Sequence, residues 1–115
     1  MKKIKIEKTK ITENKVKFHG NENKEVDYKD LIGVALDVIP QGGFTPKDIR
    51  DRNRIQEALD KATLSIITLE DADYEALEKI IKDSRWTLRD PELNIFLKKF
   101  EDGVYKKEEE KEDKK

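Results

Sequence analysis

The chain has 115 residues, 44% of them charged and 35% hydrophobic, so we expect one modest core beneath a densely ionic surface. It has no cysteine, which excludes a disulfide framework, a thiolate zinc site and a cysteine nucleophile. The abundance of lysine and glutamate with a single methionine is typical of proteins from hot environments, and equally of a lysine-biased genome.

Charge divides the chain into three segments. Residues 1–25 hold eight lysines against four acids, residues 26–102 hold twelve basic and seventeen acidic side chains, and residues 103–115 hold five of each. We interpret them as a basic β-hairpin arm, a helical core domain and a charged tail that we expect to be disordered. The longest apolar stretch is far shorter than the roughly 20 residues of a membrane span, and the N-terminus resembles no signal peptide, so we expect a cytoplasmic protein.

The N-terminal segment alternates apolar and charged residues with the period of a half-buried strand. Ile4 and Ile6 mark a first strand, and Ile11, Val16 and Phe18 mark a second. Turn residues at 12–15 separate them, so we predict a small antiparallel hairpin, followed by a polar loop at 19–25.

Two helices and a strand are predicted next. Asp27 is a good N-cap for a helix over 27–39 whose residues are apolar on most sides, which makes it the expected centre of the core. Thr45 and Pro46 begin a helix over 46–62 with a narrow apolar stripe, hence a mostly exposed one. The β-branched run at 64–68 predicts a short strand between this helix and the next.

The stretch at 70–83 begins with four acids (Glu70, Asp71, Asp73 and Glu75), which could be a metal site or an acidic first helical turn. The acids point around the helix rather than to one point, and the glycine of an EF-hand loop is missing. Acids also stabilise the positive end of a helix dipole, so we favour the helix start and predict no metal site.

Asp90 and Pro91 begin a last helix over 91–102. The prediction is therefore an α+β fold with four helices, an N-terminal antiparallel hairpin and one short strand between helices 2 and 3. The residues expected in the core are Leu31, Leu36, Leu77, Ile80, Phe96 and Phe100.

Catalytic signatures are weak. His19 is the single histidine and has no neighbour in sequence that completes a dyad, and Ser65 and Ser84 lie in no nucleophile elbow. We therefore predict a protein without catalytic residues, metal or cofactor. A carboxylate pair brought together only by folding stays open at this point.

Two features suggest contacts with partners. Lys47, Arg50 and Arg54 share one face of the 46–62 helix, where they could contact phosphates. The acids interleaved with them, Asp51 among these, favour ion pairing on the helix surface, so nucleic-acid binding is the weaker interpretation. Tyr105 lies past the helix-ending Gly103, and we expect it to be exposed and to bind a partner.

The order of these features resembles a family of small uncharacterised proteins of tailed phages and prophages, over roughly residues 27–102. The shared features are a threonine-led helix bearing arginines, a short apolar strand, the text "LEDADY", a tryptophan and a phenylalanine-centred last helix. Here they are Thr45, Arg50, Arg54, Leu59, residues 69–74, Trp86 and Phe96. The resemblance implies a gene among virion structural or morphogenesis genes, and it brings no catalytic residue.

From these observations we predict a non-catalytic phage or prophage protein. We expect it to contact other phage or host proteins, or copies of itself, during virion assembly. The alternative is a small DNA-binding regulator that uses the 46–62 helix and the basic hairpin. A third possibility is a host-directed inhibitor whose acidic body mimics nucleic acid.

Overall fold

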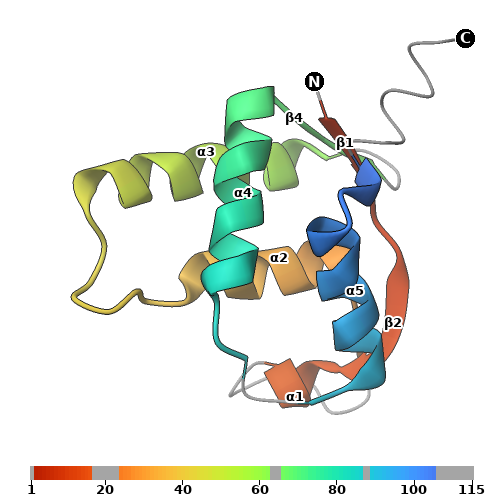
Figure 1. The fold of residues 1–115 in the computed structure, drawn as a ribbon. Helices are drawn as coiled ribbons and strands as arrows, with labels where there is room; N and C mark the ends of the chain where they lie inside the picture. The colour runs from red at the N-terminus through yellow and green to blue at the C-terminus, as the bar shows by residue number, and fades with distance from the viewer. Residues whose placement is uncertain (1, 17–23, 63–65, 87–88, 106–115) are drawn as a thin grey trace, which may run out of the picture.

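A computed structural model describes residues 2–16, 24–62, 66–86 and 89–105 of the chain. It has the predicted α+β architecture, with four long helices and a strand between the second and third of them (Figure 1). The elements in chain order are β1 (Lys2–Lys5), β2 (Lys8–Thr12), α1 (Glu13–Val16), β3 (Glu25–Asp27), α2 (Tyr28–Asp37), α3 (Pro46–Lys61), β4 (Ile66–Leu69), α4 (Asp71–Asp83) and α5 (Pro91–Glu101). The expectations for His19, Ser65 and residues 106–115 fall outside the described residues.

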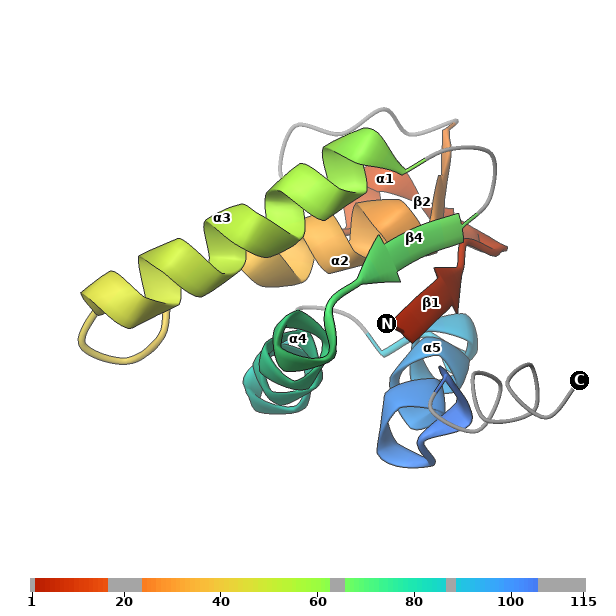
Figure 2. The ribbon, with the colours of Figure 1, turned by 90° about the horizontal axis from the view of Figure 1, so that it is seen from above.

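The strands form two antiparallel pairs whose members are separated in sequence. β1 pairs with β4, with Ile4 opposite Ile67, and β2 pairs with β3 across a register shift. Figure 2 shows β1 and β4 side by side, with α3 on the far side of β4. Antiparallel pairing is thus present as predicted, but residues 12–15 are not a tight turn between two paired strands, because α1 begins at Glu13.

α2 lies in the middle of the core, as its nearly continuous apolar surface predicts. Its start is fixed by a capping box, in which the Asp27 carboxylate accepts from the Asp30 backbone N–H and the Asp30 carboxylate accepts from that of Asp27. Leu31, Ile32 and Ala35 are fully buried. The predicted centre of the fold is therefore confirmed.

The remaining core comes from the strands and from α4 and α5. Ile4 and Ile11 belong to the same buried cluster as the helices, so the basic N-terminal segment contributes to the common core. Of the six residues predicted to be inside, five are buried, and Ile80 packs half-buried against the cluster.

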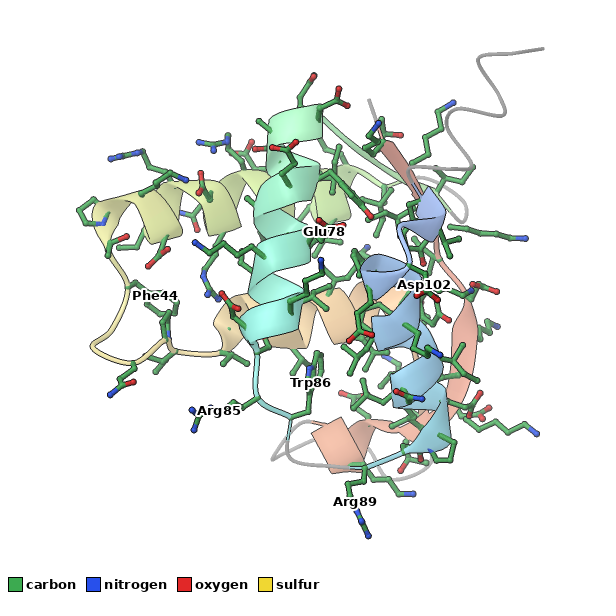
Figure 3. All side chains as sticks on the ribbon, in the orientation of Figure 1. Phe44, Glu78, Arg85, Trp86, Arg89 and Asp102 are labelled. Atoms are coloured by element: carbon green, nitrogen blue, oxygen red, sulfur yellow. The ribbon has the colours of Figure 1, made fainter. Side chains whose placement is uncertain are left out.

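Aromatic rings join α5 to its neighbours. The Phe96 ring lies edge-on to Tyr28 of α2 with centroids 4.8 Å apart, and Phe100 stacks on Tyr74 of α4 at 6.1 Å. Trp86, in the link before α5, is edge-on to Phe96 at 6.4 Å (Figure 3). Large buried side chains each stabilise the fold by roughly 1.5–3 kcal/mol, so this cluster is a main source of stability.

Candidate functional site

The acidic start of α4 serves the fold. Asp73 accepts a hydrogen bond from Arg54 Nε of α3 at 3.0 Å, and its side chain is mostly buried. Glu70 occupies the N-cap position without a side-chain capping bond. Within the described ranges, no group of three or more His, Cys, Asp or Glu side chains is arranged to hold a metal ion. Of the four acids, Asp73 thus pairs with α3, and Glu70 stands at the N-cap of α4.

The basic face of α3 is largely neutralised from within the molecule. Lys47 Nζ lies 2.7 Å from a carboxylate oxygen of Asp51, and Arg54 donates to the other oxygen of the same group. These hydrogen bonds, that of Lys47 first, hold the pKa of Asp51 below its usual range although burial opposes them. Arg54 also reaches Asp73 on α4, so it joins two helices.

Arg50 is the remaining member of that basic face. Its side chain is exposed and, in the part of the chain that the structure describes, makes no ion pair or side-chain hydrogen bond. The structure therefore does not bring Lys47, Arg50 and Arg54 together as a free phosphate site. Two of the three cations are occupied by carboxylates of α3 and α4.

Tyr105 requires a correction. It is only 1% exposed, and its ring packs edge-on against Phe100 with centroids 5.3 Å apart. A ring buried in this way has no face to offer a partner. The segment expected as a tail from residue 103 therefore still contributes to the core as far as Tyr105.

Arg52 is the residue that sequence reasoning missed. Its Nη1 donates to the carbonyl oxygens of Ala35, Leu36 and Val38 at 2.8–3.1 Å, at the C-terminal end of α2. Its guanidinium also lies over the Phe44 ring at 5.0 Å. A cation at this end of a helix satisfies unpaired carbonyls and the helix dipole together. No spacing in the sequence predicts it, because the acceptors lie 14–17 residues earlier in the chain.

Three large apolar side chains remain exposed where α2 connects to α3. Ile39 is 70% exposed, Phe44 39% and Ile49 48%, and we call these three residues the apolar tip. Phe44 and Ile49 occupy the two sequence positions of a hydrophobic staple around the Thr45 cap, and both are nevertheless exposed. Figures 1 and 3 show the connecting loop and the first turns of α3 projecting away from the other helices.

Hollows also lie elsewhere on the surface of the described residues, and two of them are well defined. One, of about 440 Å³, is mostly apolar and is formed at the start of α5 by Arg89, Asp90, Pro91, Leu93, Asn94 and Leu97. The other, of about 490 Å³, runs between α3, β4 and the start of α4, and we call it the α3–β4 groove. Its lining residues are Arg54, Glu57, Ala58, Lys61, Ala62, Ile66, Thr68, Leu69, Glu70 and Asp73.

Comparison with protein-family models, with curated proteins and with solved structures finds no match to this chain. Among the described residues, no helix has the length and apolar character needed to cross a membrane.

Proposed function

We propose that this protein is a non-catalytic phage or prophage protein that acts in the host cytoplasm by binding other proteins, in virion assembly. The apolar tip carries this proposal. Isolated exposed apolar residues are ordinary, but three large ones within eleven residues on a projecting corner favour a surface that becomes buried against a partner. The resemblance to small uncharacterised proteins of tailed phages and prophages, which implies a gene among virion structural or morphogenesis genes, suggests the biological setting.

The hydrogen bonds and ion pairs of the polar side chains support a binding role rather than catalysis. The Ser84 hydroxyl donates to the Ile80 carbonyl at 2.6 Å, and the Thr9 hydroxyl donates to the Val26 carbonyl at 2.7 Å. Both hydroxyls thus bond to backbone carbonyls, Ser84 within its own helix end and Thr9 across to β3. Lys99, a further half-buried cation, has a raised pKa because its contacts with Glu7 and Tyr28 outweigh the effect of burial.

A DNA-binding regulator is less well supported. Phosphate contacts through Lys47 or Arg54 would have to compete with the carboxylates that already hold them. Binding that depends on phosphates weakens steeply with salt, because counterions are released. A nonspecific 30-bp duplex titrated at about 50 mM salt would separate the two functions, and we expect no salt-sensitive complex.

The direct test combines mass and crosslinking. Light scattering after size exclusion gives the molar mass of the wild-type chain over a range of concentrations. A photo-crosslinking residue at position 44 then identifies what the tip touches, another copy or a second phage protein, in cells producing the phage. We expect a defined crosslinked species that Ile49→Ser removes. Ile95→Ser, which alters an exposed isoleucine of α5 outside the tip, should leave it in place.

A persistent monomer that forms no crosslinked species at position 44 would overturn the proposal. So would crosslinks that are equally abundant in the Ile49→Ser and Ile95→Ser variants.

A further inference from the structure

The apolar tip is an ordered part of the structure. Just before Phe44 the backbone forms a turn, in which the N–H of Gly43 donates to the carbonyl of Pro40 at 2.9 Å. Gly42 in this turn has a φ of +86°, a conformation that favours glycine. The guanidinium of Arg52 lies 5.0 Å from the centroid of the Phe44 ring. A surface that is ordered in this way loses little conformational entropy when it binds.

Opposite charges stand at the two ends of the segment that carries the tip, residues 37–50, which we call the tip segment. Asp37 is exposed at the end of α2, two residues before Ile39. Arg50 is exposed on α3, directly after Ile49. In the part of the chain that the structure describes, neither Asp37 nor Arg50 makes an ion pair or a side-chain hydrogen bond. An acid and a base are therefore available on either side of the apolar side chains.

The position of Asp37 is unfavourable for its own helix. An acid in the last turn of a helix lies at the negative end of the helix dipole, which favours cations. In α2 this end is stabilised by Arg52, which donates to three carbonyl oxygens there. Asp37 therefore does not stabilise α2, and an acid at this position is better explained by a contact outside the chain.

The other charges of the tip segment are engaged within α3. Lys47 is paired with Asp51, and the carboxylate of Asp48 accepts from the backbone N–H of Thr45. The segment thus offers a partner three apolar side chains with one acid and one base, and no net charge. Such a surface is complementary to a copy of itself, because a twofold axis can place the acid of each copy opposite the base of the other.

The place of the tip in the fold leaves room for a second copy. The connecting loop and the first turns of α3 project beyond α4 and α5 (Figures 1 and 2). Two copies can therefore meet tip to tip without a clash between their other helices. The tip segment is shorter than the roughly 20–30 residues that a stable interface takes from each partner, so the contact should be reversible.

We propose that two copies of this protein form a symmetric dimer through their apolar tips. Ile39, Phe44 and Ile49 of the two copies bury one another around the twofold axis, and Asp37 of each copy pairs with Arg50 of the other. The inference rests on the proposed function, since it names a second copy of the chain as the partner of the tip.

The first measurement is sedimentation equilibrium of the purified full chain over a wide range of concentrations at low salt. We expect a reversible equilibrium between monomer and dimer. Added salt should weaken the dimer, because the paired charges lie at the exposed rim of the contact. Ile49→Ser should raise the dissociation constant of the dimer about tenfold or more, because Ile49 is buried only in the dimer.

Charge reversal tests the pairing itself. Asp37→Lys and Arg50→Glu each place like charges opposite one another twice, so each variant alone should have a dissociation constant about tenfold or more above that of the wild type. An equal mixture of the two variants should associate about as tightly as the wild type, because both contacts then join opposite charges. Asp37→Lys also places a cation where the dipole of α2 favours one, so a weaker dimer would not reflect a weaker helix.

The control variants make the same changes of charge away from the tip. Glu75→Lys on α4 and Arg89→Glu before α5 are at exposed positions and should leave the dissociation constant unchanged. A dimer that these controls weaken as much as Asp37→Lys and Arg50→Glu do would respond to net charge alone, and the proposed pairing would be wrong.

The inference would be overturned by a wild-type chain that stays monomeric at every concentration, by a dimer that neither reversal weakens, or by a mixture that associates no better than its components. The measurement on the wild type stands even where a variant fails to fold. A monomer whose position 44 crosslinks to a second phage protein in cells would contradict the dimer and leave the proposed function in place. A monomer without any crosslink would contradict both.

Discussion

The two halves of α3 are used in opposite ways. The C-terminal half packs against the core through Ile55 and Leu59, and charged residues along the helix are engaged by α2 and α4. The N-terminal half projects with the apolar tip and leaves Ile49 in solvent. In the N-terminal half the charged Arg52 bonds to α2 while the apolar Ile49 faces solvent, which is the reverse of the usual arrangement. The comparison of the two halves thus separates residues that support the fold from residues available for binding.

Truncation of one aliphatic side chain in each half of α3 should give the largest difference in stability. Leu59→Ala should lower the free energy of unfolding by about 2–5 kcal/mol, because Leu59 is fully buried. Ile49→Ala, a matched change in the exposed half, should cost less than about 0.5 kcal/mol. Urea unfolding followed by far-UV circular dichroism measures both. Equal losses would mean that the projecting half is packed in solution.

The next largest effect concerns the arginines. Arg52→Ala should destabilise the protein by about 2–3 kcal/mol, because three carbonyls at the end of α2 lose a charged donor at a half-buried position. Arg50→Ala, two residues earlier and exposed, serves as the control and should change stability by about 0.5 kcal/mol or less. Urea unfolding measures the stability of both variants. An unchanged free energy of unfolding in Arg52→Ala would show that water replaces the guanidinium without loss of stability.

These two arginines also show how far the sequence could predict the structure. Helix boundaries followed from caps such as Asp27, Thr45 and Asp90, and five of the six predicted core residues followed from periodicity, since both signals are local. Arg52 and the pairing of β1 with β4 depend on chain reversals that bring distant residues together, and no local pattern encodes these. Tyr105 was misjudged because a residue after a helix-ending glycine can still fold back onto the helix.

The candidate surfaces were harder to predict still. Lys47, Arg50 and Arg54 were correctly placed on one helix, and the pairing of Lys47 with Asp51 is visible as an i, i+4 spacing. The capture of Arg54 by Asp73 is not visible, because it crosses from α3 to α4. The apolar tip was hidden for a different reason. Ile39 and Ile49 are exposed because no other element of the described structure covers them. Sequence periodicity shows which residues are apolar but not which elements will cover them.

A smaller effect is expected from the ion pair that serves both halves. The pKa of Asp51 is lowered on folding from an ordinary value of 3.8, so the unfolded chain takes up the proton first as pH falls. Its contribution is complete well above pH 4 and is lost as pH drops through the folded pKa. Asp51→Asn should cost about 1 kcal/mol at pH 7, since its partners are largely exposed, and almost nothing near pH 2. Urea unfolding of both proteins at pH 7, 4 and 2 measures the difference, and a constant gap would contradict a role for the charge.

The smallest change in stability is expected at the tip itself, where it is the most informative. Ile39 is the most exposed large apolar residue in the described part of the chain, so Ile39→Ser should alter the free energy of unfolding by less than about 0.5 kcal/mol. The same substitution should reduce crosslinking from position 44, because burial of such a side chain against a partner contributes roughly 1.5–3 kcal/mol to binding. If Ile39→Ser keeps the stability of the wild type but loses crosslinking, the tip is a surface for binding a partner. A large loss of stability would instead show that Ile39 packs within its own chain, and the contrast between the two halves of α3 would disappear.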